Sequence, residues 1–340
     1  MKTDKLMDSF RLKWLDLIRA VGAFLVVLAH VEYSGAGNNL VTSFYFVITR
    51  TAVPLFFMAS GFLLLSKKES YLDFFKKRAL KVFLPFLIWS VIYLVWQKEA
   101  LDQPFLTIVK IYFVKIIHGP RANHLWFFYE LFGLYLFTPI LRLFVEKAEK
   151  RDLLYFCGIW FLFTPFVGLL EEFTPIKVGF EYYFLNGYVG YFIFGYLAGR
   201  LQFTRTHKLI AAMVFLVNLI LTLMGFYFLD LYDIKSQYLD SYLSVNIVLM
   251  SVSLFVMFTE THVPDRLYSS VSLLSRASFG IYLVHVLVMT EFFSLPLFSS
   301  LNLIGSAEYM IPLLGLLSYI LSLLLVVVLQ KIPILKYIVP

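Results

Sequence analysis

The chain has 340 residues, of which 60% are hydrophobic and 15% charged, and its formal net charge is +7. Soluble globular domains carry roughly 45–50% apolar and about 25% charged residues, so this composition excludes an ordinary water-soluble domain and indicates an integral membrane protein. The single cysteine, Cys157, excludes an intrachain disulfide and a site built from several thiolates.

Apolar runs long enough for membrane helices follow one another along the sequence. A bilayer-spanning helix needs about 20 mostly apolar residues. Charged or turn-rich breaks separate ten such runs, at 14–33, 44–65, 80–96, 124–145, 152–170, 184–200, 208–229, 243–260, 277–298 and 309–331. A weaker run at 104–117 is interrupted by Lys110 and Lys115 and predicts an interfacial or re-entrant segment. The sequence therefore predicts an all-α integral membrane protein, a bundle of about ten transmembrane helices.

The distribution of basic residues predicts the orientation of these spans. If the N-terminus is cytoplasmic, 21 Lys and Arg residues fall in inside segments and 6 in outside segments. Cytoplasmic loops carry an excess of Lys and Arg, so we expect both termini in the cytoplasm. The first run contains Arg19 and lacks a small-x-small cleavage pattern, which favours a span over a cleaved signal peptide. Residues 1–340 are predicted to form a single membrane domain with no soluble domain appended.

Two ionisable residues lie in the first run, where charges are expensive. At mid-helix each costs about 2.5–3.5 kcal/mol or more by insertion scales. Arg19 and His30 are eleven residues apart, almost three helical turns, so both side chains project from one face, about 16 Å apart along the axis. A guanidinium grips phosphate or carboxylate, and a neutral imidazole can accept a proton near pH 7. The alternative is that Arg19 anchors at headgroups and His30 is hydrogen-bonded at a helix end.

The second predicted span begins at a proline. Arg50 lies four residues before Pro54, which removes a backbone donor, and Ser60-Gly61 permits close helix approach. Arg50 is a candidate site residue, with a headgroup-facing arginine on a kinked helix as the alternative.

Later spans carry further polar groups. The fourth opens at the outer interface with His124, followed by Trp126, whose ring also fits an interfacial aromatic belt. Glu130 is nearly two turns deeper and could pair with an arginine, a histidine or water; residues of this kind are more often structural partners than acids or bases. The ninth span contains His285; a lone histidine inside a helix is usually a packing residue, and its position in a membrane makes a functional role an open alternative.

Several kinds of site are missing from the sequence. No two histidines are spaced i, i+4 and no HExxH occurs, so no metal site is predicted. A glycine-rich phosphate loop, a G-x-S-x-G elbow and a nucleic-acid module are also missing. A basic loop on the cytoplasmic side suits topology and anionic lipid, and would equally suit the phosphates of a CoA-type donor. Its members are Lys67, Lys68, Lys76, Lys77, Arg78 and Lys81.

As a set, these segments resemble the motifs of the acyltransferase 3 family of bacterial membrane O-acyltransferases. Residues 15–30 are similar to the family's arginine–ten residues–histidine signature. Three more motifs follow in the family's order: VPLFFMASG at 53–61 with Arg50 before it, HLWF at 124–127 with Leu134-Tyr135 and Thr138-Pro139, and SFGIYLVH at 278–285. The chain looks most like short members without a periplasmic domain, including enterobacterial-common-antigen and exopolysaccharide O-acetyltransferases.

The resemblance implies a multi-pass protein of the bacterial cytoplasmic (inner) membrane. Its implied donor is an acyl-CoA, usually acetyl-CoA, and its acceptor a hydroxyl of a cell-surface polysaccharide or lipid-linked glycan. His30 takes the role of the essential catalytic histidine, with Arg19 in contact with the donor. The expected substrate-binding residues are Arg50, His124, Trp126, Glu130 and His285, with Glu130 included on physical grounds alone. Membrane lipids and other polysaccharide-assembly proteins are the expected partners, and nucleic acid is not.

The expected mechanism is direct acyl transfer, in which His30 removes the proton of an acceptor hydroxyl that attacks the thioester. A covalent acyl-His30 relay is an alternative within this class. From a different class, a transporter or flippase for a glycan or lipid-linked intermediate would also explain buried arginine, histidine and glutamate.

Overall fold

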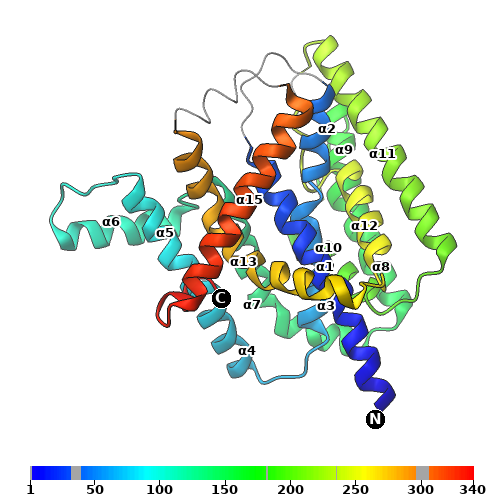
Figure 1. Cartoon of the computed structure of the whole chain (residues 1–340). Coiled ribbons are helices and arrows are strands. Elements are labelled where there is room, and N and C mark those ends of the chain that lie inside the picture. The colour runs from blue at the N-terminus through cyan, green and yellow to red at the C-terminus, as the bar shows by residue number, and fades with distance from the viewer. Residues whose placement is uncertain (1, 32–39, 181–182, 235, 296–305) are drawn as a thin grey trace.

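The computed structural model of the chain describes residues 2–31, 40–180, 183–234, 236–295 and 306–340. Within these residues all regular secondary structure is helical (Figure 1). The helices are α1 (Lys2–Ala29), α2 (Leu40–Thr49), α3 (Ala52–Leu65), α4 (Tyr71–Arg78), α5 (Leu84–Trp96), α6 (Phe105–His118), α7 (Trp126–Lys147), α8 (Lys150–Phe161), α9 (Val167–Phe173), α10 (Val189–Ala198), α11 (Arg205–Leu231), α12 (Val245–Phe258), α13 (Asp265–Phe293) and α15 (Ala307–Lys331).

Seven helical segments in the described part of the chain are long and apolar enough to cross a bilayer. They are Leu40–Leu65, Tyr71–Trp96, Asn123–Lys147, Lys150–Phe173, Arg205–Leu231, Asp265–Phe293 and Ala307–Lys331. The chain is therefore an all-α, multi-pass membrane protein. The predicted spans 184–200 and 243–260 correspond to the shorter apolar helices α10 and α12, and 14–33 corresponds to α1. The count of ten spans and the cytoplasmic position of both termini stay predictions.

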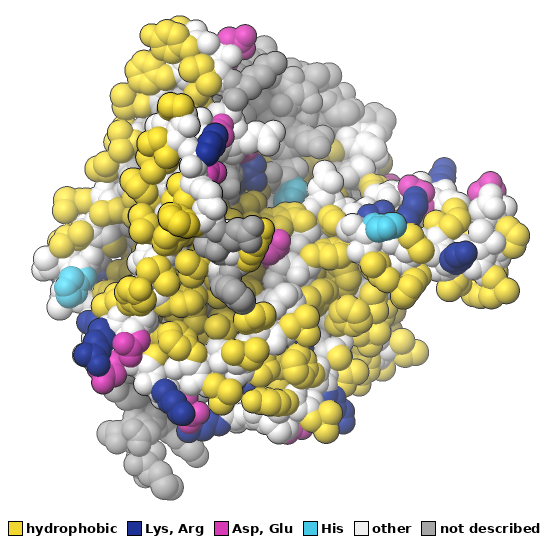
Figure 2. Space-filling view, turned by 180° about the vertical axis from the view of Figure 1, so that it is seen from behind, with side chains coloured by type: hydrophobic (Ala, Val, Ile, Leu, Met, Phe, Trp, Pro, Cys, Tyr) yellow, Lys and Arg dark blue, Asp and Glu magenta, His cyan; other side chains and the backbone are white. Residues whose placement is uncertain are grey.

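The outer surface of the bundle is apolar. Hydrophobic side chains cover most of the face in Figure 2, while charged side chains gather along its lower edge and on the protruding arm formed by α6. In α11 only 17% of the apolar window is buried in the protein, and Leu209, Met213, Leu216 and Ile220 are exposed. In water such a surface would aggregate, whereas lipid tails solvate it.

α1 lies at the centre of the bundle and packs against α3, α13 and α15 (Figure 1). Its neighbour α3 packs very closely on α10. A Cβ added to Gly61 would lie 1.9 Å from the carbonyl oxygen of Phe192, and one added to Gly195 would lie 2.0 Å from that of Met58. The two backbones therefore touch, as the predicted role of Ser60-Gly61 requires.

The second predicted span is broken where the sequence places Arg50. α2 ends at Thr49 and α3 begins at Ala52, so Arg50 and Thr51 lie between the two helices. The cause is Pro54, whose ring clashes with the carbonyl four residues earlier, which is that of Arg50. The break turns the Arg50 side chain toward α12 and the loop before it, where its partners lie.

The segment predicted to be interfacial or re-entrant at 104–117 forms helix α6, which projects sideways from the bundle with the outer end of α5 (Figure 1). An ion pair between Lys115 and Glu99 ties it to the loop after α5, together with a hydrogen bond from the Tyr112 hydroxyl to the Glu99 carbonyl at 2.8 Å. Most of its apolar side chains are exposed, including Phe105, Leu106 and Phe113.

Candidate functional site

Arg19 is held on α1 by a polar network between α1 and α13. Its Nη2 donates to the hydroxyl of Ser278 at 3.3 Å. One turn away, the Asp16 carboxylate accepts from Ser275 at 2.6 Å and from Tyr268 at 3.0 Å. The Ser278 hydroxyl in turn donates to the Ser275 carbonyl at 2.7 Å. These bonds fix the direction of the guanidinium within an otherwise apolar helix interface.

Arg19 lines a cavity of about 250 Å³ among α1, α3, α7 and α13. A second guanidinium, that of Arg78, lines the same cavity, although Arg78 lies 59 residues further along the sequence, at the end of α4. Ser60 and Tyr135 supply hydroxyl groups to the walls, and most of the remaining lining is apolar. The cavity combines two cations with an apolar interior, and so suits a ligand with an anionic end and an apolar or weakly polar chain.

His30 follows the last residue of α1, and its proton position is set by its neighbours. Its Nδ1 lies 2.8 Å from the carbonyl oxygen of Val26 and 3.3 Å from Nε2 of His285. Nδ1 of His285 lies 2.8 Å from the carbonyl oxygen of Tyr282. A carbonyl oxygen can only accept, so both Nδ1 atoms carry a proton, and Nε2 is the unprotonated nitrogen of each neutral ring. His285 therefore accepts from His30 through Nε2.

His124 completes a cluster of three imidazoles from three different helical regions. Its ring centroid lies 5.0 Å from that of His285 and 6.0 Å from that of His30. The sequence predicted His124 at the outer interface; instead only 2% of it is exposed, because Tyr93 and Tyr282 pack against its ring. Among the described residues neither of its ring nitrogens has a hydrogen-bond partner. Orphaned buried polar atoms of this kind are rare and need an explanation, such as a bound ligand or water.

His30 and His124 line a second cavity, of about 470 Å³, at the C-terminal end of α1, eleven residues beyond Arg19. Trp96, Gln97, Arg121 and Asn123 contribute further polar groups to its walls. The volume lies within the range of small-molecule sites.

Tyr282 lies between the two cavities. Its ring lines the Arg19 cavity, and its hydroxyl donates to the backbone carbonyl of His124, which lines the His30 cavity. Phe127 and Phe128 pack against the Tyr282 ring and line the Arg19 cavity with it. A narrow aromatic wall therefore separates the space beside Arg19 from the space beside the histidines.

Arg50 and Trp126 lie in a separate cluster. Arg50 Nη2 is 3.6 Å from the Asp240 carboxylate, and its Nη1 donates to the Tyr242 hydroxyl at 3.1 Å. The Tyr242 ring packs on Trp126 with centroids 5.3 Å apart. Glu130, considered as a partner for Arg50, is exposed and makes no ion pair with any described residue, because Asp240 takes that place.

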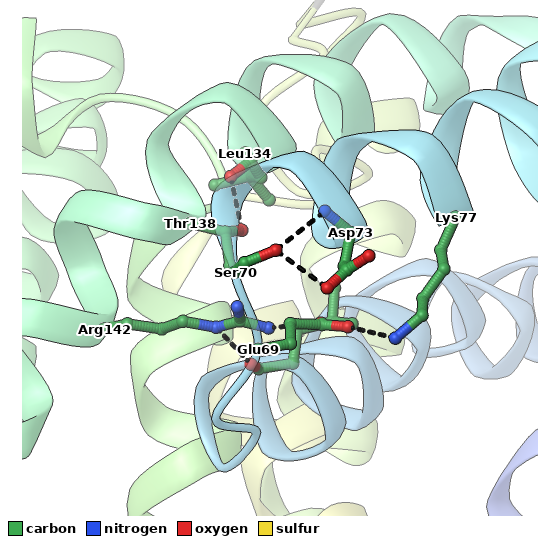
Figure 3. Close-up of polar contacts among 8 residues, drawn as sticks. Glu69, Ser70, Asp73, Lys77, Leu134, Thr138 and Arg142 are labelled. Carbon is green, nitrogen blue, oxygen red and sulfur yellow. Dashed lines mark hydrogen bonds and ion pairs between the residues drawn. The ribbon is translucent and has the colours of Figure 1, made fainter.

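The predicted basic loop is only partly a loop: Lys67 and Lys68 lie between α3 and α4, Lys76, Lys77 and Arg78 lie on α4, and Lys81 follows in a helical segment. One carboxylate organises this region (Figure 3). Glu69 lies between Arg142 and Lys77, at 2.9 Å and 2.7 Å. Burial alone would raise the pKa of Glu69, but hydrogen bonds from Lys77 and Arg142 lower it to about 2. Ser70 caps α4 by accepting from the backbone N–H of Asp73 at 3.1 Å. The loop is therefore a fixed structure at the end of the bundle.

Several positive charges gather around Lys67 in the same region, although Glu69 partly offsets them. Burial, and then repulsion from Arg78, lowers the pKa of Lys67, with Lys77 and Lys81 adding to the repulsion. Like charges gathered in this way favour the binding of an anion, which relieves the repulsion. One of these residues, Arg78, also lines the Arg19 cavity.

Seven residues were expected at the site, and the structure divides them. His30, His124 and His285 meet in one cluster, Arg19 lies about three turns before His30 on α1, and Arg50 and Trp126 share Tyr242. Arg78, Arg121 and Tyr282 were not singled out from the sequence as site residues. Arg78 was named only as one member of the basic loop, and Arg121 was counted only as a topology-determining charge. In the described part of the chain no group of three His, Cys, Asp or Glu residues could hold a metal ion.

The fold and site define a multi-pass helical membrane protein in which arginine and histidine side chains line two partly open cavities. The sequence profile of an acyltransferase domain, that of the acyltransferase 3 family, matches residues 12–331. The chain therefore belongs to the acyltransferase 3 family and is a membrane acyltransferase. The family membership predicted from the four motifs is confirmed.

A curated relative gives a weaker match. A serine/alanine racemase from Enterococcus gallinarum is 28% identical over 182 residues, which are 48% of this chain and 24% of that protein. The chain thus spans only a small part of the relative's length, and the match assigns no activity to it. No solved structure matches the chain.

Proposed function

We propose that this protein is an O-acetyltransferase of the bacterial cytoplasmic (inner) membrane. It moves an acetyl group from acetyl-CoA to a hydroxyl of a cell-surface polysaccharide or lipid-linked glycan, of the enterobacterial-common-antigen or exopolysaccharide kind. The observation that carries the proposal is the placement of Arg19 and His30 on one helix, each lining its own cavity, with Tyr282 between them. Acyl transfer requires a donor site, an acceptor site and a base, and two cavities lined by an arginine and a histidine about three turns apart support this assignment.

The donor enters at the Arg19 cavity. Its phosphates bind the basic residues around Arg78, Lys67 among them, and Arg19 contacts the donor inside. The pantetheine arm is thin and largely apolar, which suits the remaining lining. For the thioester to approach His30, the side chain of Tyr282 has to rotate, since it stands between the two cavities.

His30 acts as the general base of the transfer through its Nε2 atom. Nε2 removes the proton of the acceptor hydroxyl as its oxygen attacks the thioester carbonyl, forming the new C–O bond. The C–S bond then breaks, and the thiolate of CoA leaves and takes up the proton from the imidazolium. Throughout this sequence Nδ1–H of His30 stays hydrogen-bonded to Val26 and His285, which stabilises the transient positive charge.

Apart from His285, which positions His30, the other expected site residues bind the acceptor. His124 offers buried ring nitrogens beside His30, and an acceptor hydroxyl would satisfy them. Arg50 and Trp126, with Glu130 on the same helix as Trp126, form a polar and aromatic surface on which further sugar units of the glycan would rest. Membrane lipids and other polysaccharide-assembly proteins are the proposed partners.

Glycan analysis of a strain that lacks this protein tests the proposal. The wild-type gene should restore an O-acetyl mass lost from a surface glycan, and the His30→Ala variant should not, because general base catalysis contributes about 10²–10⁴-fold. His118→Ala serves as the matched control, since His118 is exposed at the end of α6. Both variants must be present in the membrane at the wild-type level.

Two outcomes would contradict the proposal. Retained acetylation in the His30→Ala strain would exclude His30 as the base. Loss of the whole glycan from the surface, with no acetylation in any strain, would instead indicate the transporter or flippase.

A further inference from the structure

The His30 cavity is lined by one positive charge and, among the described residues, by no negative one. Of the residues that line it, Arg121 is the only one with a permanent charge, and no described Asp or Glu lines it. Two carboxylates lie outside this lining: Glu291 accepts from Nε1 of the cavity residue Trp96 at 2.5 Å, and Glu99 pairs with Lys115. The cavity that contains the base is therefore positive, with no internal counter-charge in the described part of the chain.

Arg121 is held in place from two directions. Its Nε donates to the Gly119 carbonyl at 2.8 Å, and its own carbonyl accepts from Gln97 Nε2 at 3.0 Å. No described residue hydrogen-bonds or ion-pairs with its two Nη groups. A guanidinium fixed through Nε presents its Nη edge as a fork that matches the two oxygens of a phosphate or carboxylate.

The rest of the cavity suits a sugar. Trp96 presents a flat ring whose orientation is set by the bond to Glu291, and the side chains of Gln97 and Asn123 are exposed amides that can donate to and accept from hydroxyl groups. These neutral groups recognise hydroxyls without selecting for charge. Selection for charge is left to Arg121.

We propose that this cavity is the acceptor subsite, and that the acceptor is an anionic sugar whose phosphate or carboxylate binds Arg121 while one hydroxyl reaches His30. This inference rests on the proposed acetyl transfer and adds the substrate class. A neutral sugar would leave the guanidinium without a counter-ion, so it would bind more weakly.

Matched pairs of small acceptors test the inference in detergent-solubilised full-length protein. The pairs are N-acetylglucosamine with its 1-phosphate, and glucose with glucuronic acid; labelled acetyl-CoA reports transfer, and tryptophan fluorescence, to which Trp96 contributes, reports binding. In the wild type the anionic member should bind with at least about tenfold higher affinity, the effect of one charged hydrogen-bonding group. Arg121→Gln should abolish this preference with binding of the neutral member unchanged, and Arg121→Lys should restore part of it.

Controls separate the possible results. Lys110→Gln, on the exposed side of α6, should keep the wild-type preference. Inorganic phosphate should compete with the anionic sugars. If Arg121→Gln has an effect only in vesicles that contain phosphatidylglycerol, Arg121 binds lipid headgroups, and the inference is overturned. Equal affinity for both members in the wild type, or an unchanged preference in Arg121→Gln, would also overturn it. Failure of the acetyl transfer itself is recognised separately, as activity that survives in His30→Ala.

Discussion

His285 accepts a hydrogen bond from the Nδ1–H group of His30. In many enzymes a carboxylate accepts the corresponding bond from a catalytic histidine, whereas here the acceptor is a neutral imidazole. Nε2 of His285 accepts from Nδ1–H of His30 at 3.3 Å, while the Val26 carbonyl shares the same proton at 2.8 Å. His285 is fully buried and its own proton is held by the Tyr282 carbonyl. Such a neighbour orients the ring of His30 without adding a full negative charge to the apolar interior.

A positioning role for His285 predicts a specific kinetic result. His285→Leu removes the acceptor and should lower kcat about tenfold, the loss of one net hydrogen bond of roughly 1–1.5 kcal/mol. The KM values for donor and acceptor should stay within about twofold of wild type, because His285 makes no contact with either substrate and its loss leaves substrate binding unchanged. His285→Gln can accept through Oε1 and should recover part of kcat. A rise in KM with unchanged kcat, or identical rates in the two variants, would contradict this role.

At the scale of the helices, the contact between α3 and α10 positions one wall of the Arg19 cavity. Gly61 and Gly195 each face a backbone carbonyl of the opposite helix, so no side chain fits between them. Ser60, the neighbour of Gly61, lines the cavity. A shift of α3 would therefore displace both the cavity wall and the break at Arg50.

Gly61→Ala should destabilise the protein, because its Cβ would lie 1.9 Å from the Phe192 carbonyl oxygen. Relieving such an overlap by backbone movement costs about 1–3 kcal/mol or more. The matched control is Gly133→Ala in the middle of α7, where a Cβ would meet nothing within 4 Å; it should stabilise the helix by up to about 1 kcal/mol. Thermal unfolding in detergent, monitored by size-exclusion chromatography, measures the stability of both variants. Equal melting temperatures for the two variants would contradict the close backbone contact.

For the whole molecule, the sequence predicted the type of fold and the family but not the assembly of the site. Hydropathy and charge alone indicate membrane helices, because the bilayer requires about 20 apolar residues for each crossing. The meeting of His30, His124 and His285 depends on how α1, α7 and α13 pack, and no spacing along one helix encodes it. Sequence spacing did place Arg19 and His30 on one helix, which the structure confirms for α1 and the residue after it.

Arg78 and Arg121 were also underestimated from the sequence, because their place beside the cavities depends on how the helices pack. Arg78 and Arg121 lie in or beside loops, where an excess of arginine already has a topological explanation. Only the three-dimensional structure shows that one lines the Arg19 cavity and the other the His30 cavity. The burial of His124 was also missed, because a histidine at the start of a span is equally compatible with the interface.

The central claim is that the acetyl group passes from a donor on the Arg19 side to an acceptor on the His30 side. Sealed proteoliposomes of known orientation test it, with labelled acetyl-CoA supplied only on the side of Lys67 and Arg78 and the acceptor only on the other. The account predicts labelled acceptor on the opposite side in wild-type vesicles and none in His30→Ala vesicles. Label found only on acceptor supplied on the donor's side, or an undiminished yield with His30→Ala, would contradict it.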